Sequence, residues 1–204
     1  MSNAVYFNTY KLNEGSFVPD FKLAVENLFS GYISKQPGFV SSMLLLDGDL
    51  WADCTVFETT EDAKKFANAG GSNDLANKFY SYLDFGTCQS NLFSVKQKNT
   101  AQSVAPSIVT VVTFKLRKGT SLEDFALASE KLYGDIHTLD DVYISSMQLL
   151  DGDLWADLLL WKSMEGPNKA ASAEREKTSP AVNEYLSFIG AVPFHHHFAV
   201  EKCF

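Results

Sequence analysis

The sequence predicts an α+β protein made of two ferredoxin-like β-α-β-β-α-β repeats, whose antiparallel sheets pack face to face within one chain. The first observation is a repeated run: residues 45–53, LLDGDLWAD, recur letter for letter as residues 149–157. The second is that both halves show the same order of strand and helix patterns. The third is a polar stretch without periodicity between the halves. We therefore expect repeats at residues 1–98 and 107–204, joined by a linker at residues 99–106.

The elements of the first half follow from residue patterns. Residues 5–12 are rich in β-branched and aromatic residues and predict a strand. Apolar residues at helical spacing, from Phe21 to Phe29, predict a helix that opens at Ser16 or Val18. The remaining expected elements are strands at 39–46 and 49–58, a helix at 60–69 that breaks at Gly70-Gly71 and resumes at 73–83, and a strand at 90–96.

The second half repeats this order. Thr120 or Ser121 can cap its first helix, since an acidic residue follows three positions later. Gly166-Pro167 and Thr178-Ser179-Pro180 mark the starts of later helices. The expected strands are residues 109–116, 143–150, 153–162 and 194–201.

Composition narrows the class of function. The formal net charge is −8 with no basic block, which argues against nucleic-acid and anionic-membrane partners. No apolar run approaches the roughly 18 residues of a membrane span, and the N-terminus lacks signal-peptide features. The three cysteines form no CxxC pair. Unpaired thiols of this kind are typical of proteins in a reducing compartment. We expect a cytoplasmic protein.

The repeated run also predicts how side chains are grouped. A two-residue type I′ turn at Asp47-Gly48 would pair Leu46 with Asp49 and place alternate residues on one face. We expect this face to look into the space between the sheets, and Met43 and Leu45 to lie under the helices. The residues grouped on the inner faces are Ser42, Trp51, Asp53 and Phe57, with Ser146, Gln148, Trp155, Asp157 and Trp161 in the second half.

A buried carboxylate in both halves is the strongest candidate for chemistry. Asp53 and Asp157 could polarise or deprotonate a ligand, so we name them as candidate catalytic residues. The other residues of the two inner faces would form the ligand-binding walls. The alternative is structural: the two carboxylates would only hydrogen-bond Ser42 and Ser146, or would lie in water at the rim of the barrel.

Metal binding has weaker support. His195 and His197 share one face of a strand and could chelate a metal, but a third ligand would have to come from elsewhere. Asp47, Asp49 and Asp53 lack the later ligands of an EF-hand calcium loop.

Several motifs carry a resemblance to a known family. They are Trp161, residues 59–63 (TTEDA) and residues 178–186 (TSPAVNEYL). With them the chain resembles a tandem pair of antibiotic biosynthesis monooxygenase-like domains, from the dimeric α/β barrel superfamily. That family often has a histidine early in the second helix, where this chain has Phe66 and Ala170.

The resemblance implies a function. Family members include cofactor-independent oxygenases that act on aromatic compounds, as well as haem-degrading proteins. It implies a cofactor-independent monooxygenase-like protein that binds a small apolar or aromatic ligand between the two sheets. The alternative is a non-enzymatic, stress-type ligand-binding or structural interaction module of the same fold. An intrachain pseudo-dimer closes the barrel and leaves further homo-oligomers open.

Overall fold

The computed structural model describes residues 3–69, 73–139, 141–172 and 178–204 of the chain. The break that we expect at Gly70-Gly71 lies outside these residues. The elements of the first repeat are β1 (Ala4–Leu12), α1 (Val18–Gly31), a 3-10 turn (Ile33–Lys35), β2 (Phe39–Asp47), β3 (Leu50–Phe57), α2 (Thr60–Ala69), α3 (Asp74–Tyr80) and β4 (Leu83–Thr100). Those of the second are β5 (Ile108–Leu116), α4 (Leu122–His137), β6 (Tyr143–Asp151), β7 (Leu154–Trp161), α5 (Glu165–Ala170), α7 (Pro180–Phe188) and β8 (Ile189–Cys203).

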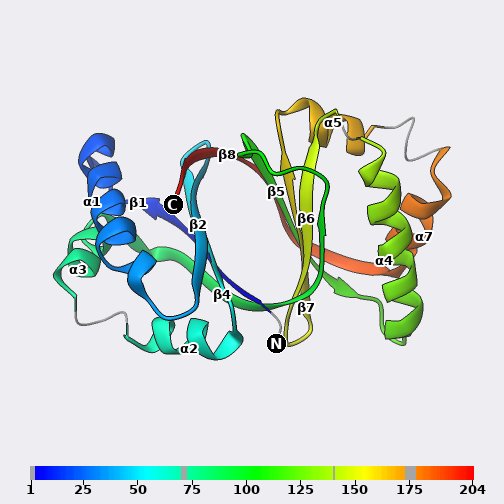
Figure 1. Ribbon diagram of the computed structural model, residues 1–204, viewed down its shortest axis with the longest axis horizontal. Helices are drawn as coiled ribbons and strands as arrows, with labels where there is room; N and C mark the ends of the chain where they lie inside the picture. Colours follow the sequence, from blue (N-terminus) through cyan, green and yellow to red (C-terminus); the bar gives the residue numbers. More distant parts are fainter. Residues whose placement is uncertain (1–2, 70–72, 140, 173–177) are drawn as a thin grey trace. The chain divides into compact units, whose positions relative to one another are not determined.

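The predicted fold class is confirmed. Hydrogen bonds join eight strands in the order β1-β3-β2-β8-β5-β7-β6-β4, and β4 pairs with β1, so the antiparallel sheet is closed. In each repeat the helices lie on one side of the strands, α1 and α3 in the first and α4 and α7 in the second (Figure 1). No helix of the described residues is long and apolar enough to cross a membrane.

Each of the two compact units includes a short segment of the other repeat. One unit comprises residues 1–95 and 200–204, and the other comprises residues 96–199. The boundary expected after residue 98 therefore falls inside β4. In the first unit Phe204 exchanges backbone hydrogen bonds of 2.8 and 3.1 Å with Ser42. In the second unit the Ala101 amide, just past β4, donates to the Ile144 carbonyl at 2.9 Å.

The starts of α4 and α7 follow the expected capping chemistry. Ser121 accepts a hydrogen bond from the Asp124 amide at 3.2 Å and caps α4. Ser179 caps α7 in the same way, through the Val182 amide at 3.2 Å. Because such caps satisfy amides that have no partner within the helix, they fix where each helix begins.

The hairpin turn differs from its prediction by one residue. Asp47 pairs with Leu50, so Gly48 and Asp49 are the two central residues of the turn. Gly48 has a φ of 61°, and no described residue other than glycine has a positive φ. A positive φ at the first central position alone matches a type II′ turn. Leu46 pairs with Trp51, where we expected it to pair with Asp49. Because this relative shift is two residues, the same side chains still share a face.

This turn gives a stability prediction. Gly48→Ala should lower the free energy of unfolding by about 1–2 kcal/mol, because an L-residue is strained in the left-handed region. Nothing lies within 4 Å of the added Cβ, so no steric clash contributes. Urea unfolding measures the change.

A glycine in a helix supplies the matched control. Gly134, inside α4, also has open space around an added Cβ, and it is not among the positive-φ glycines. Gly134→Ala should therefore raise the free energy of unfolding by up to about 1 kcal/mol. Equal effects of the two substitutions would contradict the turn assignment.

Candidate functional site

The face that carries Asp53 lies under the helices of its own unit. Trp51, on the same face, packs edge-on against Phe21 of α1 with ring centroids 4.9 Å apart. Leu44, on β2, and Phe79, on α3, belong to the same buried cluster. The expectation that this face looks into the space between the sheets is therefore wrong. The physical reason is that the aromatic faces of α1 and α3 need an apolar surface, which Leu44 and Trp51 supply.

The second unit has the same arrangement. Trp155 packs against Phe125 of α4, with ring centroids 5.0 Å apart. Gln148 donates a 3.0 Å hydrogen bond from Nε2 to the Ser129 hydroxyl, also on α4. The face of Asp157 is therefore the helix-covered face as well.

A cavity of about 320 Å³ lies in the first unit, with Asp53 in its wall. It is bounded by residues of β1, β3, β4 and the helices α1, α2 and α3. Most of its lining is aromatic or aliphatic, including Phe29, Phe66, Phe79 and Tyr80. A largely apolar cavity of this volume with a few polar groups is typical of small-molecule sites.

Asp53 is buried and has few hydrogen-bond donors around it. Asp53 is only 6% exposed. The side-chain amide of Asn8 donates a hydrogen bond to the Oδ1 atom of Asp53 at 2.8 Å. Burial raises the pKa of Asp53 to about 7, against the opposing effect of the Asn8 hydrogen bond. A carboxylate with a pKa near 7 is suited to take up a proton from a ligand at neutral pH.

Two other buried polar atoms line the site without a partner. Among the described residues, neither the Tyr10 hydroxyl nor the Asn8 Oδ1 atom makes a hydrogen bond, although both are buried. Both residues line the cavity. Burial, and then the charge of Asp53, raises the pKa of Tyr10 well above its ordinary value, so the phenol remains a donor. Buried polar atoms without partners cost about 1–3 kcal/mol each, which a bound ligand could relieve.

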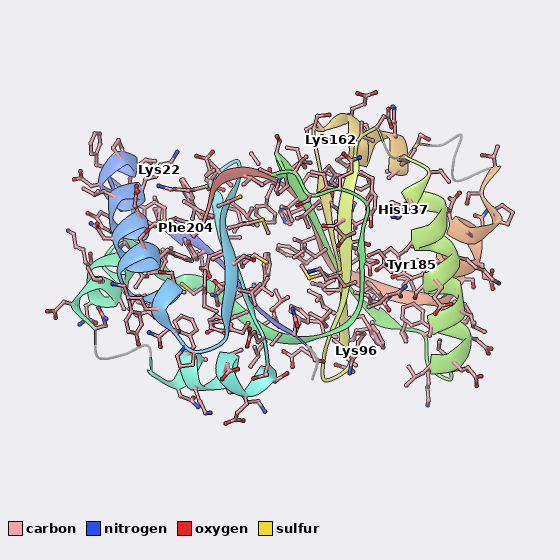
Figure 2. All side chains as sticks on the ribbon, viewed as in Figure 1. Lys22, Lys96, His137, Lys162, Tyr185 and Phe204 are labelled. Carbon is pink, nitrogen blue, oxygen red and sulfur yellow. The ribbon has the colours of Figure 1, made fainter. Side chains whose placement is uncertain are left out.

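The surroundings of Asp157 are different. The hydroxyls of Tyr133 and Tyr185 donate to its two carboxylate oxygens at 2.5 and 2.6 Å. Burial raises the pKa of Asp157 to about 6, and hydrogen bonds from Tyr133, Tyr185 and Gln148 oppose this rise. Tyr185 lies between the helices and the strands of this unit (Figure 2). The cavity beside Asp157 measures about 160 Å³.

The expected serine partners lie elsewhere. The Ser42 hydroxyl is 2.8 Å from the Thr55 hydroxyl, and the Ser146 hydroxyl is 2.8 Å from that of Tyr143. The structural alternative for Asp53, a hydrogen bond to Ser42, does not describe this site, because Asn8 is the donor that Asp53 has.

The expected aromatic walls are mostly core residues. Trp51, Phe57 and Trp155 pack in buried clusters and are not part of the cavity linings. Trp161 does line the cavity of the second unit, and its indole donates to the Thr110 hydroxyl at 3.0 Å. Phe66 and Ala170, where the family often has histidine, line the first and second cavity respectively.

The two histidines of β8 are neighbours, as their spacing predicts. The rings of His195 and His197 have centroids 4.9 Å apart, and His197 Nδ1 is 2.8 Å from the Thr110 hydroxyl. Within the described part of the chain, no group of three or more His, Cys, Asp or Glu residues could hold a metal. The third ligand that this pair would need is thus not found there.

Four residues of these sites were not predicted from the sequence: Asn8, Tyr10, Tyr133 and Tyr185. A signal for three of them is present in the repeat itself. At the offset of 104 residues, Asn8 corresponds to Val112, Tyr10 to Phe114 and Tyr133 to Phe29. Where one repeat has a polar residue and the other has an apolar residue at the equivalent position, the buried surroundings of the two repeats must differ.

Comparison with known proteins identifies the fold. No protein-family model matches the sequence, and no curated protein matches it. A structure from Fusobacterium nucleatum with a proposed monooxygenase assignment is 9% identical and has a TM-score of 0.69, covering 99% of this chain and 94% of that one. An anthrone oxidase-like protein is 11% identical, with a TM-score of 0.66 and coverage of 100% and 93%.

A third structure names the fold. A ferredoxin-fold protein from Listeria monocytogenes, related to antibiotic biosynthesis monooxygenases, is 9% identical with a TM-score of 0.59, and the alignment covers 98% and 95% of the two chains. The chain therefore has the ferredoxin-like dimeric α/β barrel fold of these proteins, as the sequence motifs predicted. At such low identities the likeness establishes the fold alone.

Proposed function

We propose that the first unit binds a small hydroxylated aromatic compound in its cavity and that Asp53 acts as a general base on the ligand hydroxyl. The observation that carries this proposal is the meeting of Asp53, Asn8 and Tyr10 in a cavity lined mostly by aromatic and aliphatic side chains, where two buried polar atoms have no partner among the described residues. Aromatic walls favour a flat apolar ligand, and the polar atoms favour one that carries hydroxyl or carbonyl oxygens.

Each polar group has a role in this proposal. Asp53 takes the proton of the ligand hydroxyl, since its pKa of about 7 lies near neutral pH. Tyr10 stays protonated and donates a hydrogen bond to the oxygen that becomes negatively charged. Asn8 holds the Asp53 carboxylate in place through its 2.8 Å hydrogen bond. Asn8 and Tyr10 act from alternate positions of β1, on one face of the strand.

We further propose that the bound anion reacts with dioxygen without a cofactor. In the reaction one oxygen atom replaces a ring hydrogen and becomes a carbonyl. The second oxygen atom leaves as water, with the displaced ring hydrogen and the hydroxyl hydrogen. The ligand supplies all four electrons that dioxygen takes up, so no other reductant is required. The fold shared with an anthrone oxidase-like protein and with proteins related to monooxygenases supports this reaction class.

Calorimetric titration and an oxygen electrode test the proposal with 1-naphthol as the probe. The wild type should bind 1-naphthol, consume oxygen and form the quinone. It should bind 1-methoxynaphthalene at least about tenfold more weakly, because the ether has no proton to give to Asp53. Asp53→Asn should lower the rate of oxygen consumption by about 100-fold or more.

The control is a carboxylate on the surface of the same hairpin. Asp49 is exposed and paired with Lys11, so Asp49→Asn should leave binding and oxygen consumption unchanged. Tight binding without oxygen consumption would contradict the oxygenase step and favour the non-enzymatic ligand-binding module. Binding that is equal for naphthol and its ether, and indifferent to Asp53→Asn, would contradict the site.

A further inference from the structure

The two repeats place equivalent carboxylates in opposite surroundings. Asp53 and Asp157 are 104 residues apart and both belong to the repeated run. Asp157 receives hydrogen bonds from two tyrosine hydroxyls, each shorter than 2.7 Å. Asp53 receives its side-chain hydrogen bond from Asn8 alone among the described residues. The same carboxylate is therefore satisfied in one repeat and left with open acceptor positions in the other.

The residues responsible can be matched between the repeats. Tyr133 corresponds to Phe29 at the offset of 104 residues. Tyr185 corresponds to Phe79 by its ring contacts. It packs against Phe114 and Phe125, with centroids 6.0 and 5.4 Å away.

The first repeat has the matching pair of contacts. Phe79 packs against Tyr10 and Phe21, the equivalents of Phe114 and Phe125, with centroids 5.6 and 5.9 Å away. The first repeat thus has phenylalanine at both positions where the second has a tyrosine that binds the carboxylate.

The exchange also runs in the other direction. The first repeat has Asn8 and Tyr10 where the second has Val112 and Phe114. In the second repeat the polar groups around the carboxylate satisfy one another. In the first, the Tyr10 hydroxyl and Asn8 Oδ1 are buried without partners in the described structure. The cavity of the first repeat is also twice as large, at about 320 Å³ against about 160 Å³.

We propose that the chain has one ligand site, in the first unit, and that Phe29 and Phe79 determine this by leaving Asp53 without the hydroxyl donors that Tyr133 and Tyr185 give to Asp157. The two tyrosines are internal substitutes for the ligand hydroxyl, and they close the second site. The identity of the ligand rests on the function proposed above. The different states of the two carboxylates do not depend on it.

The decisive variant transfers the tyrosines to the first repeat. In Phe29→Tyr/Phe79→Tyr the new hydroxyls should occupy the acceptor positions of Asp53. Titration of the wild type with 1-naphthol should give one molecule per chain, and the double variant should bind it at least about tenfold more weakly. Tyr143→Phe removes a tyrosine hydroxyl of the second unit that pairs with Ser146 and lies outside both cavity linings, so it should leave the affinity for 1-naphthol unchanged.

A measurement without ligand separates this inference from the proposed function. In carbon-13 NMR of aspartate carboxyls, Asp53→Asn identifies the Asp53 signal. The double variant should move the titration midpoint of Asp53 downward by about one pH unit, because hydrogen bonds to the carboxylate favour its charged form. Its melting temperature at pH 8 should not fall below that of the wild type, which shows that the variant folds.

The outcomes are distinct. Two molecules of 1-naphthol per chain, or an unchanged Asp53 midpoint in the folded double variant, would overturn the inference. A wild type that fails to bind naphthol, with the midpoint lowered in the double variant, would overturn the proposed ligand and support the assignment of the two tyrosines.

Discussion

Asp53→Asn is expected to stabilise the ligand-free protein at neutral and alkaline pH by up to about 4 kcal/mol. Burial raises the pKa of Asp53 from 3.8 to about 7, and each unit corresponds to about 1.4 kcal/mol. The folded protein therefore holds a proton between pH 4 and pH 7 that the unfolded chain releases. The stability of the wild type falls as pH rises through this window and levels off above pH 7. The neutral amide escapes this loss.

Urea unfolding from pH 4 to pH 8 measures the effect. The difference between Asp53→Asn and the wild type should be small near pH 4 and should reach its full size near pH 8. The charge of Asp157 titrates in both proteins and cancels in the comparison. A variant that is less stable than the wild type at pH 8 would show that the Asp53 carboxylate stabilises the fold. In that case the burial of the Asp53 carboxylate would not lower the stability of the fold, and the view that Asp53 is kept for ligand binding at the expense of stability would be contradicted.

Tyr133→Phe/Tyr185→Phe is expected to have the opposite effect. Each hydroxyl donates to the buried Asp157 carboxylate, and hydrogen bonds to charged groups contribute about 1.5–3 kcal/mol. The double variant should lose about 3–6 kcal/mol of stability at pH 8. The loss should shrink toward pH 4, because the protonated carboxyl no longer depends on the two donors.

The control for this variant is a tyrosine with a neutral partner. Tyr143→Phe removes a 2.8 Å hydrogen bond to the Ser146 hydroxyl and should cost about 1 kcal/mol, with little dependence on pH. Equal losses for the two variants at pH 8 would contradict the view of Asp157 as a charge held by its tyrosines.

Much of the fold could be predicted because the information is local and occurs twice. Apolar spacing located the helices, and caps such as Ser121 and Ser179 fixed their starts. The repeated run grouped Trp51 and Asp53 on one face, and the observed pairing keeps that grouping. The turn was displaced by one residue, because the glycine can occupy either central position of a two-residue turn.

The location of the site could not be predicted in the same way. Alternation divides a strand into two faces but does not say which face the helices cover, and both faces of β3 are buried. The sequence pattern at Trp51 is therefore equally compatible with a residue of a ligand-binding wall and with a residue of the core. The missed residues Asn8 and Tyr133 come from β1 and α4. Their approach to the carboxylates depends on tertiary packing that no single sequence window contains.

The presence of both repeats in one chain has a genetic consequence. In a dimer of identical one-repeat chains, any substitution changes both copies of a site at once. In a chain that carries both repeats, a mutation such as the one that separates Phe29 from Tyr133 changes one copy and spares the other. Residues 200–204 are part of the first unit and residues 96–100 are part of the second, so each unit contains a short segment from the other repeat. The surroundings of one carboxylate can therefore change by mutation while those of the equivalent carboxylate in the other repeat stay the same.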